Sequence, residues 1–267
     1  YLLFYFKKIM SKSIYKNVKI ANELELNNYL KQYPETKYLD AIISDLSGLF
    51  RGKRIPIKDA GKLFSQGIQF CYSTFLLDAS GYCPDVKGRG FSDGDPDATY
   101  YPIANTIKPL PWHKDSIAQV LISIQDEHRY SSLVDPRNIL AKVSEIFSEI
   151  KLFPKVAFEL EFYLFDKRKS IYERPKVATS PKSKRRSEGT QVYGMKELDD
   201  YYDFLEDVNV FCKKQNIPAT TASSEFAPGQ YEINLNHTED ILKAADDSAF
   251  LRRLIKETAE LHGYEAS

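Results

Sequence analysis

The sequence has few cysteines and no excess of charge of either sign. Cys71, Cys83 and Cys212 are the only cysteines among 267 residues, and they are odd in number and widely spaced. This argues against a disulfide framework and against a cysteine-based zinc site, and it predicts a reducing compartment, the cytoplasm. Lysine plus arginine equals aspartate plus glutamate, 37 each. The chain therefore has no net charge that would attract nucleic acid or an acidic membrane surface as a partner.

The sequence also lacks long apolar runs and glycine-rich phosphate loops. No run reaches the roughly 18 apolar residues that a spanning helix needs, so we expect no membrane contact. There is no Gly-x-Gly-x-x-Gly and no Walker loop, so a nucleotide would bind on an unconventional surface. Residues 1–9 precede Met10 and show no signal-peptide pattern. We expect these nine residues to come from sequence upstream of the native start.

Turn and cap signals divide the chain into two predicted domains. The first, residues 10–134, is predicted to contain a helix over 17–33, a hairpin over 38–57 and a strand over 115–127. Asp135 and Pro136 then read as the N-cap and first residue of a helix that continues to about residue 150. The second domain is therefore expected over residues 135–267.

The predicted second domain combines apolar strands with amphipathic helices. Its expected elements are a strand over 158–166, a helix over 201–215, a hairpin within 217–235 and a helix over 244–262 closed by Gly263. Between residues 167 and 190 the sequence turns polar and basic. One short basic cluster on a neutral chain predicts a solvated loop rather than a nucleic-acid contact.

Two glutamates interrupt the apolar run FELEFYLFD at residues 158–166. The aromatic and leucine content of this run, with Pro154 just upstream, predicts a β-strand. On a strand, Glu159 and Glu161 face the same side, roughly 6.5–7 Å apart, while the alternate residues face a core. No lysine or arginine lies two positions away to neutralise them. Their face is therefore either solvated or occupied by something cationic.

A second pair of glutamates lies in the segment SSEFAPGQYEINL. Pro228 and Gly229 are typical of a type II turn. If the strands pair directly from this turn, Glu225 faces Glu232. Like charges directly opposite each other in a hairpin are destabilising. The alternative interpretation is that Glu225 and Glu232 lie at a solvent-exposed edge of the sheet and bind nothing.

Two such pairs in one chain favour a common cation. Three or four carboxylates without histidine or cysteine suit a hard ion, Mg²⁺ or Mn²⁺. Such ions usually serve phosphate chemistry. The alternative for the first pair alone is the acid and base of a glycosidase, which leaves the second pair unexplained.

These motifs resemble glutamine synthetase-type ligases. The matching segments are FELEFYLFD, SSEFAPGQYEINLNH and AADDSAFLRRLIKETAELHGYEAS, and SDLSGLFRGKRIP resembles the family's N-terminal domain. The likeness is strongest to the branch of γ-glutamylpolyamine and γ-glutamylputrescine synthetases. It implies an α+β fold with a β-grasp-like N-terminal domain and a catalytic domain built on an antiparallel sheet. It also implies a ring-shaped homo-oligomer with active sites between neighbouring subunits.

The resemblance assigns roles to the four glutamates. It implies that Glu161, Glu225 and Glu232 are ligands of a first metal and that Glu159 is a ligand of a second. In the family the ions, Mg²⁺ or Mn²⁺, hold ATP and glutamate. The γ-carboxylate attacks ATP to give γ-glutamyl phosphate, and a primary amine or ammonia then displaces the phosphate. Divalent cations remove the repulsion between the two anionic substrates.

Two departures from the family pattern bear on activity. Ammonia-using members carry an aspartate in a Phe-Asp-Gly-Ser-Ser segment that helps to bind and deprotonate ammonium, and here the corresponding stretch is FCYSTF, with Cys71 at that position. This favours an amine other than ammonia. The family also continues well beyond residue 267, with the remaining second-metal ligands, the phosphate-binding arginines and most nucleotide contacts. We therefore expect a chain truncated at its C-terminus, the N-terminal half of a ligase, to be inactive alone.

The rival hypothesis is a non-catalytic remnant or an assembly protein that keeps the scaffold without the reaction. Retention of the three first-metal glutamates favours descent from an active enzyme. The expected loss of the second half favours inactivity. The sequence leaves both hypotheses open.

Overall fold

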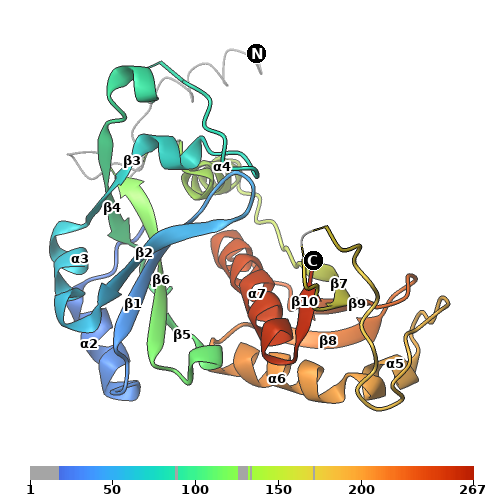
Figure 1. Ribbon diagram of the computed structural model, residues 1–267. Coiled ribbons are helices and arrows are strands. Elements are labelled where there is room, and N and C mark those ends of the chain that lie inside the picture. Colours follow the sequence, from blue (N-terminus) through green and yellow to red (C-terminus); the bar gives the residue numbers. More distant parts are fainter. Residues whose placement is uncertain (1–17, 88–89, 126–131, 133, 171) are drawn as a thin grey trace. The chain divides into compact units, whose positions relative to one another are not determined.

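The computed structural model describes residues 18–87, 90–125, 132, 134–170 and 172–267. The expected upstream extension and the first residue of the first predicted helix lie outside the described residues. The chain separates into two compact units (Figure 1). The first comprises the residues up to Lys108 together with Ser116–Leu152, and the second comprises Pro109–Asp115 and Phe153–Ser267.

The first unit is built on a mixed sheet in the order β2-β1-β6-β4-β3, with β5 pairing β6. Its strands are β1 (Tyr38–Ser44), β2 (Phe50–Pro56), β3 (Ile68–Cys71), β4 (Asp97–Pro102), β5 (Lys108–Pro109) and β6 (Ile117–Gln125). The predicted hairpin is confirmed as the antiparallel pair β1–β2, and β1 runs parallel to β6. A parallel central pair flanked by antiparallel strands is the β-grasp-like arrangement predicted for this part.

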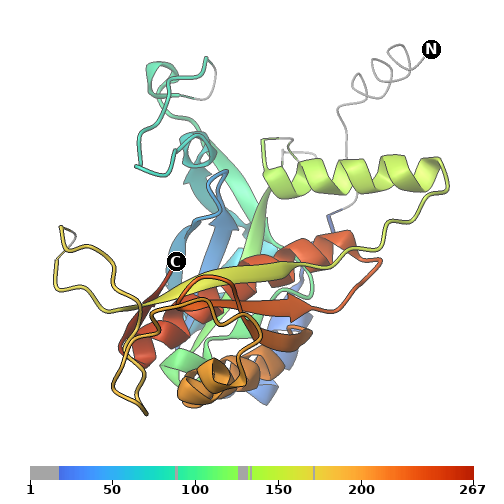
Figure 2. The same ribbon diagram turned by 90° about the vertical axis from the view of Figure 1, so that its right-hand side faces the viewer.

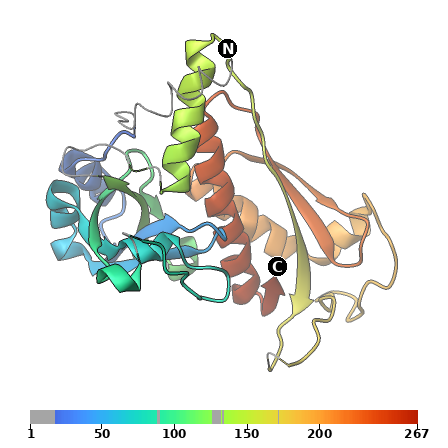
Figure 3. The ribbon, with the colours of Figure 1, turned by 90° about the horizontal axis from the view of Figure 1, so that it is seen from above.

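Helices α2 (Glu23–Gln32) and α3 (Gly61–Gln66) pack on this sheet (Figure 3). Leu26 and Tyr29 of α2 and Leu63 and Phe64 of α3 are buried in one core with residues of β1 and β6. Short 3₁₀ turns lie at Ile57–Asp59, Tyr72–Phe75 and Phe91–Asp93.

Helix α2 begins later than the sequence pattern predicted. Ile20 forms a bridge with Ile103, and the Ala21 N–H donates to the Pro102 carbonyl at 2.8 Å. The backbone before residue 22 is therefore extended, and Asn22 caps the helix by accepting from the Glu25 N–H. Leu24, although apolar, is 63% exposed, because the buried stripe of the helix runs through Leu26 and Tyr29.

Helix α4 (Pro136–Glu149) begins as predicted. The Asp135 side chain caps it by accepting from the Arg137 N–H at 2.9 Å. The other Asp135 carboxylate oxygen accepts from the Ser123 hydroxyl on β6 at 2.7 Å. These contacts group α4 with the first unit. The proposed domain boundary between residues 134 and 135 remains a prediction.

The second unit is built on an antiparallel sheet in the order β10-β7-β9-β8. Its strands are β7 (Glu159–Asp166), β8 (Ala219–Ser224), β9 (Gln230–Leu235) and β10 (Tyr264–Ala266), and its helices are α5 (Met195–Asp200), α6 (Tyr202–Lys214) and α7 (Ile241–Leu261), with a 3₁₀ turn at Pro111–His113. The predicted α+β fold with an antiparallel sheet is confirmed. None of the helices in the described residues is long and apolar enough to cross a membrane.

Helices α6 and α7 cover one face of this second sheet (Figure 2). Phe162 on β7 and Tyr231 on β9 are buried on that face, with ring centroids 6.0 Å apart. Phe204 of α6 packs edge-on against Phe162 at 6.1 Å. Because neighbouring residues on a strand point to opposite faces, this aromatic core turns the intervening residues to the other side of the sheet.

The basic segment 167–190 is a loop, as predicted, in the residues that the structure describes. It is tied to the end of β7 through Asp166, which accepts from the Thr179 N–H at 2.7 Å and from Arg186 at 2.6 Å. Burial alone would raise the pKa of Asp166, but these hydrogen bonds and the Arg186 charge hold the pKa below its ordinary value. The loop is therefore anchored at its base.

Candidate functional site

Strand β7 presents Glu159 and Glu161 on one face, as the sequence predicted. Both are exposed, whereas Phe162 and Leu164 on the opposite face are only 5% and 0% exposed. Phe158, expected in the core, lies just before the strand and is 38% exposed. The alternation that places the two carboxylates together is otherwise confirmed.

The register of the sheet adds a third glutamate to this face. In the antiparallel pair β7–β9, Glu161 lies directly opposite Glu232, and Glu159 lies opposite Asn234. Side chains directly opposite each other have Cβ atoms about 4.5–5.5 Å apart. Two carboxylates from different strands are therefore direct neighbours.

The predicted pairing of Glu225 with Glu232 is wrong. Ser223 is the partner of Glu232, and the Glu225 N–H donates to the Gln230 carbonyl at 2.8 Å. The turn itself lies where predicted, since Gly229 has a φ of 73° and the Gln230 N–H donates to the Ala227 carbonyl.

The difference arises because the hairpin loop is longer than two residues. Phe226 loops out of the ladder and is 67% exposed, so the pairing of Glu225 shifts by two positions. An even shift keeps a side chain on the same face. Glu225 is therefore a diagonal neighbour of Glu232 rather than its direct partner.

The four carboxylates act on one another electrostatically. Burial raises the pKa of Glu232, the neighbouring amide of Asn234 lowers it, and the charges of Glu159, Glu225 and Glu161 raise it, with a net upward shift. Within the part of the chain that the structure describes, none of the four forms an ion pair with a lysine, arginine or histidine. The face thus carries negative charge without a protein counter-charge.

Two amides on the same face were not singled out by sequence reasoning. Gln230 donates a hydrogen bond from its Nε2 to Glu161, and Asn234 lies beside Glu232 and lowers the pKa of that carboxyl. The Oδ1 atom of Asn234 is buried and has no hydrogen-bond partner. The signal was present in the alternation Gln-Tyr-Glu-Ile-Asn, which places both amides two positions from Glu232 on one strand face.

The donor set fits a hard divalent cation. It consists of carboxylate oxygens and an amide oxygen left without a partner, which are the ligand types that Mg²⁺ and Mn²⁺ prefer. In the described residues, no three acidic, histidine or cysteine side chains already converge closely enough to hold a metal ion. Carboxylates of like charge separate in the absence of a cation, so binding would require side-chain rotations.

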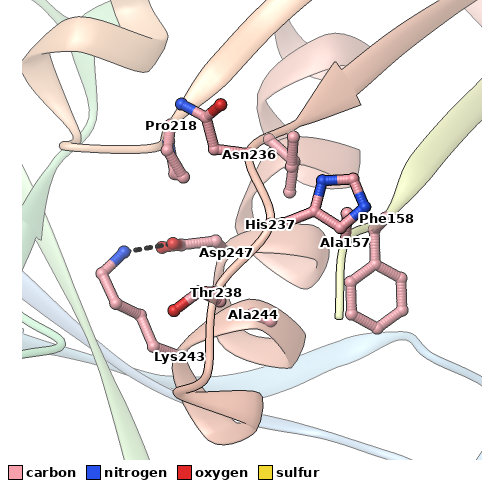
Figure 4. Close-up of a pocket in the computed structure, with 10 residues that line it drawn as sticks. Ala157, Phe158, Pro218, Asn236, His237, Thr238, Lys243, Ala244 and Asp247 are labelled. Atoms are coloured by element: carbon pink, nitrogen blue, oxygen red, sulfur yellow. Dashed lines mark hydrogen bonds and ion pairs between the residues drawn. The ribbon is translucent and has the colours of Figure 1, made fainter. Parts of the chain in front are cut away.

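Two cavities lie elsewhere in the second unit. One, of about 190 Å³, is lined by Phe158, Leu235 and His237 and by the first turns of α7, where Lys243 pairs with the buried Asp247 (Figure 4). Phe158 precedes Glu159 and Leu235 follows Asn234, so both side chains point away from the glutamate face. This cavity therefore lies on the other side of the sheet. The second, of about 400 Å³, lies between the 180–191 loop and α5. Neither contains the four glutamates.

Residues 133–267 match the family described as the glutamine synthetase catalytic domain, and this match covers half of the chain. The chain belongs to the glutamine synthetase family. It is 37% identical over 243 residues to the gamma-glutamylputrescine synthetase of Escherichia coli strain K12, covering 91% of this chain and 51% of that protein. It is 30% identical over 248 residues to a glutamate–isopropylamine ligase of a Pseudomonas species, covering 91% and 52%. The chain therefore spans about half the length of these curated relatives.

Solved structures with the glutamine synthetase fold superpose on this family member. A GmaS/ADP complex matches with a TM-score of 0.73 at 21% identity, over 91% of this chain and 50% of that one. The glutamine synthetase of Plasmodium falciparum, solved by electron cryo-microscopy, matches with a TM-score of 0.70 at 22% identity, over 94% and 51%. At these identities the likeness shows the fold.

Cys71, the predicted departure from ammonia-using members of the glutamine synthetase family, ends strand β3. It pairs with Asp97 across the sheet, and its thiol lies beside the carboxylates of Asp95 and Asp97. Burial raises the pKa of the thiol, and the two aspartates raise it further, so the thiol stays neutral. Negative charge is thus present beside residue 71 although residue 71 itself carries none.

Replacing Glu232 with Gln should stabilise the metal-free chain at neutral pH. The substitution removes a carboxylate whose pKa is raised by its neighbours, and we expect a gain of a few tenths of a kcal/mol in the free energy of unfolding. A raised pKa means that protonation favours the folded state. The gain should therefore be complete above the folded-state pKa and vanish below the ordinary glutamate value.

Urea midpoints at about pH 7 and about pH 4 test this expectation. Glu188→Gln, at an exposed loop glutamate without an ion pair in the described structure, is the control and should leave both midpoints unchanged. A Glu232→Gln variant that is less stable than the parent at neutral pH would contradict the electrostatic account.

Proposed function

We propose that this chain carries metal-binding strands of an ATP-dependent glutamate–amine ligase. The observation that supports the proposal is the direct pairing of Glu161 with Glu232, with Glu159 and Glu225 on the same face. No protein cation accompanies these carboxylates in the described structure. Natural sheets avoid like charges directly opposite each other unless something compensates for them.

The four glutamates would hold two divalent cations, Mg²⁺ or Mn²⁺. Glu161, Glu225 and Glu232 would hold the first, and Glu159 would contribute to the second. When bound, the cations neutralise charge between the phosphates of ATP and the carboxylates of glutamate. The chain's own contribution is to fix these carboxylates on neighbouring strands, so that little reorganisation accompanies the reaction.

The proposed reaction has two steps. The γ-carboxylate of glutamate attacks the terminal phosphorus of ATP, which forms γ-glutamyl phosphate and releases ADP. A primary amine then attacks the acyl carbon, the carbon–oxygen bond to phosphate breaks, and inorganic phosphate leaves as the amide forms with loss of a proton. The names of the two relatives, a gamma-glutamylputrescine synthetase and a glutamate–isopropylamine ligase, support an amine as the acceptor.

The family resemblance extends the proposal to assembly and acceptor choice. We expect the complete protein to form a ring of identical subunits with active sites between neighbours. Cys71 favours a primary amine over ammonia, because an uncharged thiol at that position gives less help in binding and deprotonating ammonium.

The experiment that tests the proposal measures phosphate release. The chain is completed with the remaining half of the Escherichia coli relative and is supplied with ATP, glutamate and Mg²⁺, with and without putrescine. Phosphate release that depends on both glutamate and amine supports the ligase. A completed, folded protein that releases none would favour the non-catalytic scaffold instead.

A further inference from the structure

Two amides frame the carboxylate pair on strand β9. Gln230, Glu232 and Asn234 alternate along the strand, so all three side chains lie on the glutamate face. Across the sheet, Glu161 is opposite Glu232, and Asn234 is opposite Glu159. Each amide is therefore adjacent to a carboxylate on its own strand and to one on β7.

The orientation of Gln230 is fixed at both ends of its amide. Its Oε1 accepts a hydrogen bond from the Ala227 N–H at 3.0 Å, which leaves its Nε2 directed at Glu161, to which it donates. A reversed amide would set two acceptors against each other at Glu161 and two donors against each other at Ala227. The turn at Ala227–Gln230 thus determines where Glu161 is held.

Asn234 carries a buried oxygen without a partner. Its amide lies beside Glu232 and lowers the pKa of that carboxyl, whereas its Oδ1 is buried and accepts no hydrogen bond. A buried amide oxygen without a donor is unfavourable, and each such group in a folded protein calls for an explanation. Here it lies on the face that carries four carboxylates, where a hydrated cation would supply a donor or a positive charge.

Neutral amides suit this position better than lysine or arginine. A basic side chain would hold the carboxylates but would also cancel their charge and compete with a metal ion. An amide N–H holds a carboxylate oxygen while leaving the negative charge in place. The two amides therefore orient the glutamates without weakening their attraction for a cation.

We propose that Gln230 and Asn234 are positioning residues that hold Glu161 and Glu232 for a divalent cation. We further propose that the Asn234 Oδ1 is an acceptor for the hydrated ion. This inference rests on the proposed function, because it concerns the same carboxylates. It adds two residues that act on the cation indirectly, by orienting the carboxylates that bind it.

The test is a Mn²⁺ titration of the full chain, followed by electron paramagnetic resonance of the free and bound ion. Gln230→Ala and Asn234→Ala should each weaken binding by about 10–100-fold, the usual effect of removing a group that orients a metal ligand. Asn209→Ala is the matched control, because Asn209 on α6 also donates to a glutamate, Glu206, at 3.4 Å. It should bind Mn²⁺ like the parent.

The variant Asn234→Asp distinguishes an effect of the amide on Mn²⁺ binding from an effect of charge and from an effect of unfolding. This variant keeps the size of the side chain and adds a negative charge, which by attraction alone would strengthen Mn²⁺ binding. If the amide acts as a positioning donor, binding should weaken instead, because two carboxylates then repel each other at Glu232. Circular dichroism of each variant monitors folding.

The outcomes distinguish this inference from the proposed function. Parent-like binding by folded Asn234→Asp, or by both alanine variants, would overturn the positioning role while leaving the metal site intact. A folded parent chain that binds no Mn²⁺ would overturn the metal site and the positioning role with it. Weaker binding in Asn234→Asp with an unchanged Asn209→Ala control would support the assignment.

Discussion

The completed protein is expected to use putrescine in preference to ammonium by at least about tenfold in kcat/KM. Two physical reasons support this expectation. The methylene groups of a diamine gain apolar contact that ammonium cannot make, and the neutral thiol of Cys71 gives less help in binding and deprotonating ammonium than a carboxylate would. Phosphate release at matched glutamate and ATP concentrations, with the acceptor varied, measures the ratio.

Two variants at residue 71 test the cause of this preference. Cys71→Asp should raise activity with ammonium and narrow the ratio, whereas Cys71→Ser, which adds no charge, should leave it unchanged. Asp95 and Asp97 already place negative charge beside this residue. A change in the putrescine-to-ammonium ratio with Cys71→Asp therefore shows that a carboxylate is needed at position 71 itself, and not merely nearby. A parent protein that prefers ammonium would overturn this interpretation of Cys71.

The chain alone is expected to release no phosphate with either acceptor. The resemblance places the phosphate-binding arginines in the half of the family that this chain does not span. Losing one such electrostatic contact typically costs about 10²–10³ in rate, and several would be absent together. Turnover by the purified chain, after removal of contaminating ATPase activity, would contradict the proposal that phosphoryl transfer needs groups that this chain does not contain.

Glu161→Gln should reduce kcat of the completed protein by about 10²–10³. Glu161 is opposite Glu232 and accepts from Gln230, so it lies at the centre of the carboxylate face. The substitution keeps the shape of the side chain but removes its charge. The remaining carboxylates would then compensate less of the cation charge during phosphoryl transfer.

Rates with saturating Mg²⁺ and with saturating Mn²⁺ measure this effect. Excess metal should restore only part of the activity, because a ligand has been lost as well as affinity. Glu188→Gln, on the exposed loop, is the matched control and should keep the parent rate. A Glu161→Gln enzyme with parent kcat would exclude Glu161 as a metal ligand.

Local signals in the sequence predicted most of the elements that carry the site. The alternation in FELEFYLFD specified both the strand and the shared face of Glu159 and Glu161. Asp135 with Pro136 marked the start of α4, and Gly263, with a φ of 77°, marked the end of α7. These features depend on neighbours within a few residues, which the sequence displays directly.

Features that depend on pairing across the sheet were harder to predict. The register of β8 against β9 depends on whether Phe226 enters the ladder, and the outward position of that side chain shifts the pairing by two residues. The direct partner of Glu232 comes instead from β7, more than 60 residues earlier in the chain. No local pattern specifies that contact.

The surroundings of Cys71 were missed for the same reason. Its neighbours Asp95 and Asp97 follow a long loop, and only the pairing of β3 with β4 brings them to the thiol. The amides Gln230 and Asn234 were visible in the alternation of β9. Their importance depended on knowing which carboxylates lie opposite them.

The most direct test of the central claim is a Mn²⁺ titration of the parent chain beside Glu161→Gln, Glu232→Gln and the control Glu188→Gln. If the glutamate face is a metal site, the parent and the control should bind Mn²⁺ saturably, and each site variant should bind at least about tenfold more weakly. Absence of saturable binding by the folded parent, or unchanged binding in both site variants, would contradict the proposal that these carboxylates bind divalent cations.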